Sequence, residues 1–176
     1  MLIPILLTLA AFLVIFLLFV ATRPADFSIT RSAIIPVSPA DAFPLINDFH
    51  EWQEWSPWAK LDPDCENTFT GPAAGVGSRF TWSGNNKVGE GSMVITESRP
   101  NEVIKLDLLF TRPMKANNRT VFSFQAANGG TQVTWTMSGK NGFAGKLFGV
   151  IVNCDRMVGG QFEQGLANLK SRVYRR

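Results

Sequence analysis

Apolar and polar residues alternate through most of the stretch from residue 79 to residue 138, and this alternation restricts the fold more than any other feature of the chain. Phe80 and Trp82 are separated by a polar residue, and so are Leu106 and Leu108. Turn-forming residues such as glycine, asparagine and proline interrupt the pattern at intervals. A period of two places successive side chains on opposite faces of a strand. The pattern therefore predicts a meander of consecutive antiparallel strands with one apolar and one polar face.

The period becomes helical after the last predicted strand. Apolar residues recur at steps of three and four between Leu147 and Val173. This spacing predicts one long amphipathic helix over residues 143–173, which would cover the apolar face of the sheet. Gly159 and Gly160 lie in its middle, where each costs about 1 kcal/mol relative to alanine. We expect them to let the sheet or a ligand approach the helix closely.

A strand and short helices are predicted before the meander. Residues 26–37 have the composition of a strand. Ser38 then provides an N-cap, followed by Pro39 at the first helical position and Asp41 at the third. Pro44 would remove one backbone hydrogen bond, so this helix should be short or kinked. The predicted order is a strand, short helices, about six antiparallel strands and a long helix, which is an α+β fold.

The segment Met1–Ala21 contains no charged side chain. About 20 apolar residues in a helix cross the roughly 30 Å of a bilayer's hydrocarbon. A cleaved signal peptide would have a basic start, a shorter apolar stretch and a small-residue cleavage site, none of which is present. Residues 1–22 are therefore predicted to be a single-pass membrane anchor, and residues 23–176 a separate domain. Arg23 and Arg31 follow the span, which favours a cytoplasmic domain.

Charge gives little indication of a polyanionic partner. The net charge is only +3 and the isoelectric point is about 9.1, whereas nucleic-acid-binding domains usually carry a dense basic patch. We therefore expect no nucleic acid partner. A basic cluster ends the chain and has two interpretations, stabilisation of a helix C-terminus or attraction to anionic lipid headgroups. It consists of Lys170, Arg172, Arg175 and Arg176.

Catalytic and metal-binding patterns are sparse. Cys65 and Cys154 lie far apart in the sequence, so we expect free, buried thiols, although one long-range disulfide stays open. His50 is the only histidine, and no metal site or cofactor is expected. Glu90 lies between two glycines and could act as a general base if it faced inward. Its parity relative to Met93 instead predicts an outward-facing carboxylate.

Three segments resemble one known superfamily. Residues 43–58 (FPLINDFHEWQEWSPW), 75–98 (GVGSRFTWSGNNKVGEGSMVITES) and 162–170 (FEQGLANLK) are similar to the helix-grip superfamily of START-like lipid-transfer domains and polyketide cyclases. The closest resemblance is to SRPBCC proteins of the polyketide cyclase/dehydrase and lipid-transport group, many of them membrane-tethered bacterial proteins. The resemblance implies a helix-grip (START/Bet v 1-like) fold, in which a curved antiparallel sheet wraps around a long C-terminal helix.

The resemblance also implies a deep apolar cavity between the sheet and that helix. Such a cavity would take a hydrophobic small molecule, for example a lipid, an isoprenoid quinone or a polyketide-like compound. Two alternatives stay open: a cyclase or dehydratase, and a protein-interaction module without a ligand. Each candidate wall residue could equally be ordinary core. The candidates are Phe80, Trp82, Met93, Ile95, Leu106, Leu108, Phe122, Phe124, Trp135, Met137, Phe148, Met157 and Phe162.

Three tryptophans at steps of three precede the predicted meander. Trp52 and Trp55 can share one face of a short helix, which Pro57 would end. We expect these two on the inner side of that helix, and Trp58 in the following loop at the mouth of the cavity. They could plug one end of the fold, contact a ligand, or insert into the bilayer interface.

Overall fold

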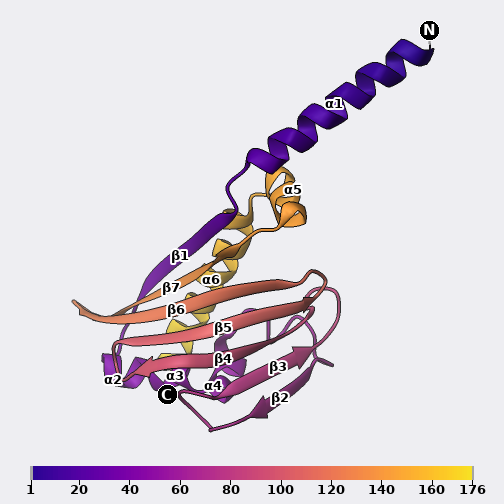
Figure 1. Ribbon diagram of the computed structural model, residues 1–176. Helices are drawn as coiled ribbons and strands as arrows, with labels where there is room; N and C mark the ends of the chain where they lie inside the picture. The colour runs from indigo at the N-terminus through magenta and orange to yellow at the C-terminus, as the bar shows by residue number, and fades with distance from the viewer. Residues whose placement is uncertain (1, 176) are drawn as a thin grey trace.

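The structure, a computed structural model, describes residues 2–175. One seven-stranded sheet dominates it, with strands in the order β1-β7-β6-β5-β4-β3-β2 (Figure 1). Every neighbouring pair of strands is antiparallel, which confirms the predicted meander. The strands are β1 (Asp26–Ile35), β2 (Glu66–Thr70), β3 (Arg79–Ser83), β4 (Glu90–Arg99), β5 (Val103–Arg112), β6 (Ala116–Ala127) and β7 (Gly130–Lys140).

Three short helices connect β1 to β2 and pack at one end of the sheet (Figure 1). Ser38 caps the first of them through its side chain, which accepts from the backbone N–H of Asp41. Pro44 starts a new helix, so the predicted interruption is confirmed. The helices are α2 (Pro39–Ala42), α3 (Pro44–Asn47) and α4 (Phe49–Trp55).

The C-terminal region forms two helices, not the single long helix that we predicted. They are α5 (Phe143–Ile151) and α6 (Cys154–Val173). Val152 between them has an extended backbone, and the side chain of Asn153 accepts from the backbone N–H of Arg156 to cap α6. The break changes the helical phase, so α5 and α6 present their apolar residues in different directions.

Helix α6 packs against β1 through a close contact at one glycine. The Arg31 side chain crosses from β1 to α6, where its Nε lies 2.7 Å from Glu163 Oε1 and its Nη2 lies 2.9 Å from Asp155 Oδ2. A Cβ at Gly159 would overlap this guanidinium, whereas a Cβ at Gly160 would meet open space. The predicted close approach is thus made at Gly159 by the sheet.

The C-terminal end of α6 is attached to α4. Arg172 Nη2 lies 2.6 Å from Glu51 Oε2, and Arg172 Nη1 lies 3.4 Å from Glu54 Oε2. The two termini lie at opposite ends of the molecule (Figure 1). Of the two interpretations of the basic tail, these ion pairs favour a structural role for Arg172.

Helix α1 (Leu2–Thr22) projects away from the sheet (Figure 1). It is the one helix among the described residues that is long and apolar enough to cross a membrane, although a signal sequence has the same properties. Its side chains are exposed except for Val20, which is buried near α5. The assignment of residues 1–22 as an anchor and of residues 23–176 as a separate domain stays a prediction.

Candidate inner-face site of the sheet

The register of the sheet aligns inner-face residues of neighbouring strands into rows that cross the strands. One row, here called the rim row, lies toward the end of the sheet from which the chain leaves for α1 and α5. The rim row consists of Phe80, Met93, Leu108, Asn118, Gly139 and Phe27. On β3 to β6 one further row lies beyond it, made of Trp82, Gly91, Phe110 and Ala116. The middle row consists of Ile95, Leu106, Thr120, Met137 and Ile29. The deep row consists of Ile104, Phe122, Trp135 and Arg31.

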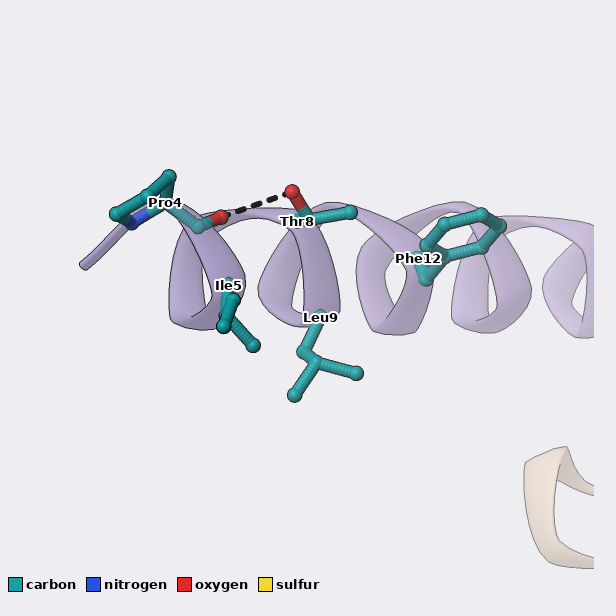
Figure 2. A pocket seen from close by; sticks show the side chains of 5 residues that line it. All are labelled: Pro4, Ile5, Thr8, Leu9 and Phe12. Atoms are coloured by element: carbon teal, nitrogen blue, oxygen red, sulfur yellow. Dashed lines mark hydrogen bonds between the residues drawn. The ribbon is translucent and has the colours of Figure 1, made fainter. Parts of the chain in front are cut away.

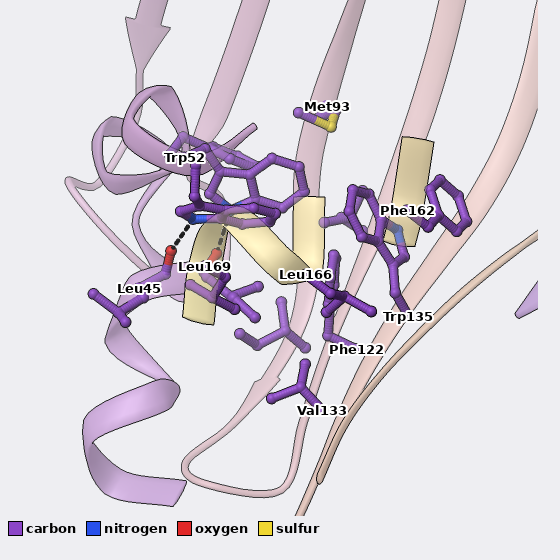
Figure 3. Packing of buried hydrophobic residues seen from close by; sticks show 14 of the residues in the cluster. Leu45, Trp52, Met93, Phe122, Val133, Trp135, Phe162, Leu166 and Leu169 are labelled. Atoms are coloured by element: carbon purple, nitrogen blue, oxygen red, sulfur yellow. Dashed lines mark hydrogen bonds between the residues drawn. The ribbon is translucent and has the colours of Figure 1, made fainter. Parts of the chain in front are cut away.

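The deep row is closed by aromatic rings (Figure 3). Trp135 stacks on Phe162 of α6, with ring centroids 4.1 Å apart and an angle of 7° between the planes. Phe122 and Trp52 meet edge to face at 5.5 Å, and Trp58 meets Trp135 in the same way at 6.0 Å. Such geometries add to the stabilisation from burial alone. This end of the inner face is a continuous aromatic cluster.

Helix α4 completes this closure, and we call the region formed by α4 and the deep row the sealed end. The indole N–H of Trp52 donates to the carbonyl of Ile46 at 2.7 Å, and that of Trp55 donates to the carbonyl of Leu45 at 2.9 Å. Both side chains are at most 3% exposed. Of the three interpretations of the tryptophans, these contacts favour a plug at one end of the fold.

Burial decreases toward the rim row. Its residues Phe80, Met93, Leu108 and Asn118 are between 7% and 9% exposed, and Phe27 is half-buried. In the deep row, by contrast, Ile104 and Phe122 are 0% exposed. The main contacts of helix α6 are with β1 and α4, and Phe49 of α4 lies 6.1 Å from the ring of Phe80 in the rim row. The four rim-row residues from Phe80 to Asn118 are therefore slightly more exposed than the apolar residues of the deep row, although all are buried.

Polar groups interrupt the apolar inner face at three buried positions. The Nε1 donor of Trp135 has no hydrogen-bond partner among the described residues, although the side chain is only 3% exposed. Thr120 and Asn118 are also buried, and the Asn118 amide lies 3.8 Å from the sulfur of Met137. An unmatched buried donor costs free energy, so it marks a position where a ligand acceptor would be favourable. The alternation that predicted Phe122 as inward-facing also places Asn118 and Thr120 inward, but our prediction did not include them.

Two hollows among the described residues lie elsewhere than the deep cavity expected between the sheet and the C-terminal helix. One hollow of about 330 Å³ follows the side of α1, along Pro4, Ile5, Thr8, Leu9 and Phe12 (Figure 2). The other, of about 510 Å³, is an open depression across β1, β5, β6 and β7. The interior is narrower than expected because large rings, above all those of Trp135 and Phe162, pack directly against each other. Ring packing of this kind depends on side-chain rotamers and cannot be read from alternation.

Most of the predicted wall residues lie together on the inner face. Phe80, Trp82, Met93, Ile95, Leu106, Leu108, Phe122, Phe124, Trp135 and Met137 are all buried there, and Phe162 faces them from α6. Phe148 on α5 and Met157 on α6 are instead exposed, so they do not join this cluster. Phe148 leaves it because the break before Asn153 separates α5 from α6 and shifts the helical phase. Met157 lies on α6 itself, but five residues before Phe162, so it occupies a different face of that helix.

Candidate catalytic groups lie outside the inner face. Glu90 accepts a hydrogen bond from the Thr111 hydroxyl at 3.0 Å, at the start of β4. The His50 ring stacks on Phe69 at 4.2 Å and its Nδ1 lies 2.9 Å from Asp48 Oδ1. The buried inner-face residues of β3 to β7 include no carboxylate among the residues described. This arrangement provides no inward-facing acid or base next to the apolar surface.

The two cysteines form no disulfide and are half-buried, so they are less buried than expected. Burial raises the pKa of the Cys65 thiol, and nearby Asp62 raises it further, which makes this thiol a weak nucleophile. No cluster of three or more potential metal ligands occurs within residues 2–175. The described residues therefore contain no evident centre for metal or thiol chemistry.

A curved antiparallel sheet that packs against a C-terminal helix and carries short helices after its first strand defines a helix-grip fold. Within this class, the chain belongs to the family described as polyketide cyclase / dehydrase and lipid transport, whose sequence model matches residues 26–174. This family is associated with binding of hydrophobic ligands. No curated protein gives a match to the chain.

Solved structures show the same fold at low sequence identity. Protein CV1439 from Chromobacterium violaceum has a TM-score of 0.61 and 13% identity, covering 83% of this chain and 96% of its own. Ara h 8.0201 has a TM-score of 0.62 and 13% identity, covering 86% and 99%. The di-domain ARO/CYC BexL from the BE-7585A biosynthetic pathway has a TM-score of 0.59 and 14% identity, covering 86% of this chain and 51% of its own.

Proposed function

We propose that this chain is a membrane-tethered protein that binds a hydrophobic small molecule on the inner face of its sheet, with the rim row as the entrance. Lipids, isoprenoid quinones and polyketide-like compounds have the required apolar character. The observation that carries the proposal is the decrease in burial from the deep row to the rim row on an otherwise apolar face. Membership of the family supports it independently.

Entry of a ligand would require side chains to move, since the interior is filled. Met93 and Met137 are suited to this because an unbranched thioether side chain adapts to many shapes. Each is 8% exposed and lies within or next to the rim row. A ligand that displaced them would reach Asn118 and then the unmatched N–H of Trp135. A guest with one hydrogen-bond acceptor on an apolar body would satisfy that donor.

The position of the rim row supports loading from a bilayer. Three residues separate the end of α1 from the start of β1, and Phe27 of β1 belongs to the rim row. β7 ends just before α5, and its Gly139 belongs to the same row. If α1 spans a membrane, the entrance lies at the membrane-proximal end of the domain. A hydrophobic ligand dissolved in the bilayer would then travel only a short distance through water.

Two variants of β4 test this proposal, with the full chain purified in mild detergent or in lipid nanodiscs. Met93→Lys places a charge on the inner face, whereas Val94→Lys places the same charge on the opposite face of the same strand. Native mass spectrometry and solvent extraction would measure hydrophobic molecules that co-purify. We expect the wild type and Val94→Lys to retain a ligand and Met93→Lys to lose it. Equal retention by both variants in a folded state would refute the inner-face site.

The filled interior also favours one alternative, a binding module that acts on another protein without a ligand. Ring stacking at 4.1 Å between Trp135 and Phe162 leaves no room between those two side chains. Repeated preparations free of hydrophobic molecules, together with no binding across a panel of lipids and quinones, would support this alternative over the first proposal.

A further inference from the structure

Helix α5 exposes an apolar surface of its own that packs on nothing else in the described chain. Phe143, Phe148, Val150 and Ile151 are 49%, 39%, 37% and 76% exposed. The helix has the sequence FAGKLFGVI, with Lys146 as its one charged residue. A short helix with this composition is unfavourable in water, because apolar area left exposed forfeits the stabilisation that burial provides.

Helix α5 lies directly against the last turns of α1 (Figure 1). The Lys146 ammonium donates to the backbone carbonyl of Ala21 at 3.0 Å. The last carbonyls of a helix have no partner within it, and a lysine at this position satisfies one of them. This contact fixes α5 beside the C-terminal end of α1.

The length of α1 sets the depth at which α5 lies. The helix has 21 residues, which gives a length of about 31 Å at 1.5 Å per residue, close to the roughly 30 Å of bilayer hydrocarbon. Ala21 would therefore lie at the boundary between acyl chains and headgroups. Arg23, which follows it, lies over the ring of Phe19 at 5.4 Å and suits the headgroup region.

We infer that α5 is an interfacial helix, which inserts its apolar surface into the same bilayer that α1 spans. Lys146 and Arg23 would then lie among the lipid phosphates, while Phe148 and Ile151 enter the acyl region. The inference rests on the proposed membrane anchoring by α1. Its consequence is a domain held at two points, with the rim row turned toward the lipid. A single tether would leave the domain free to rotate away from its source of ligand.

Spin-label depth measurements on the full chain in phosphatidylcholine/phosphatidylglycerol nanodiscs test the inference. Labels would be placed singly by Ile151→Cys, Leu9→Cys and Val76→Cys in a Cys65→Ser/Cys154→Ser background. Val76 is a matched control, since it is an exposed apolar residue in the loop between β2 and β3, away from α1. Collision rates with oxygen, which concentrates in lipid, and with a water-soluble nickel chelate give the depth of each label.

We expect the labels at positions 151 and 9 to collide several-fold more often with oxygen than with the chelate, and the label at position 76 to show the reverse. If position 9 is in lipid while position 151 behaves like position 76, the interfacial helix is refuted and the anchor stands. If position 151 is shielded from both reagents, a protein covers α5 and the inference is also refuted. If position 9 is in water, the anchor itself fails.

Discussion

The sealed end and the rim row belong to the same face of the same sheet, yet they differ in packing and in polar contacts. At the sealed end, the indole N–H groups of Trp52 and Trp55 both reach backbone carbonyls, and Phe122 is fully buried. At the rim row, Met93 and Leu108 retain some exposure. The strand alternation is identical at both ends. What differs is the covering, because α4 and α6 meet over the sealed end, whereas the rim row is covered at Phe80 by Phe49 of α4. We therefore expect the sealed end to contribute more to stability, and the rim row is the entrance that we propose.

Truncation should produce the largest effect at the sealed end. Trp55→Ala removes a side chain that is 0% exposed, and it should lower the free energy of unfolding by about 3–5 kcal/mol. Met93→Ala should lower it by no more than about 2 kcal/mol, since the rim is less tightly enclosed. Denaturant unfolding of the full chain in detergent, followed by circular dichroism, measures both values. If Trp55→Ala and Met93→Ala lowered the free energy of unfolding by similar amounts, the proposed difference in packing between the sealed end and the rim row would be wrong.

Alanine substitutions of the adjacent glycines Gly159 and Gly160 test the contact between α6 and β1. Gly159→Ala should destabilise the protein by about 1 kcal/mol, because the new methyl group overlaps the Arg31 guanidinium, which must shift away from Asp155 and Glu163. Gly160→Ala faces open space and should stabilise the helix by up to about 1 kcal/mol. Thermal unfolding of the pair measures the difference. If both changes stabilise the protein, α6 is not held by this contact.

Two substitutions of tryptophan by phenylalanine distinguish the unmatched indole N–H of Trp135 from the hydrogen-bonded indole N–H of Trp52. Trp135→Phe keeps an aromatic ring but removes the unmatched N–H, and it should weaken binding of an acceptor-bearing ligand about three- to tenfold. Trp52→Phe removes an N–H that already reaches the carbonyl of Ile46, so it should lower stability without changing affinity beyond the effect of stability. Titration with the co-purifying ligand, monitored by calorimetry, tests both. Unchanged affinity in Trp135→Phe would exclude this donor from the site.

A smaller effect should appear in the pH dependence of the β1–α6 contact. The hydrogen bond from Arg31 holds the pKa of Asp155 below its usual value. The stabilisation is therefore present at neutral pH and is lost as the pH falls through that lowered pKa. Asp155→Asn should melt at a lower temperature than the wild type at pH 7. This difference in melting temperature should disappear at acidic pH. A difference that is independent of pH would show that the charge of Asp155 contributes nothing.

Much of this arrangement follows from sequence periodicity, and the exceptions have identifiable physical causes. Alternation predicts the meander of about six strands that the structure shows from β2 to β7, because burial on one face fixes the register of each strand. The pairing of β1 with β7 does not follow from alternation. The division between α5 and α6 was missed, although Asn153 followed by Asp155 is an N-terminal helix signal within an apolar pattern. Asn118 and Thr120 were not predicted to face inward, because the prediction used only apolar residues. Both have the same strand parity as Phe122 and therefore lie on the same face.

Other features depend on information that periodicity does not contain. The filling of the interior results from the rotamers of rings such as Trp135 and Phe162, which come from elements far apart in the sequence. The sequence is compatible with three roles for Trp52 and Trp55. The hydrogen bonds from their indole N–H groups to the carbonyls of Ile46 and Leu45, which the sequence does not reveal, favour a plug over a ligand contact.

Methionine methyl groups offer the most direct measurement of whether the rim row binds a hydrophobic guest. Met93 and Met137 lie on the inner face, whereas Met114 is exposed in the loop between β5 and β6. The full chain with carbon-13 methionine methyl groups, in nanodiscs, would be titrated with a short-chain isoprenoid quinone, a diacyl phospholipid and an aromatic polyketide. For at least one of these compounds, the account predicts saturable shifts of the Met93 and Met137 signals and an unchanged Met114 signal. Unchanged Met93 and Met137 signals with all three compounds would contradict it.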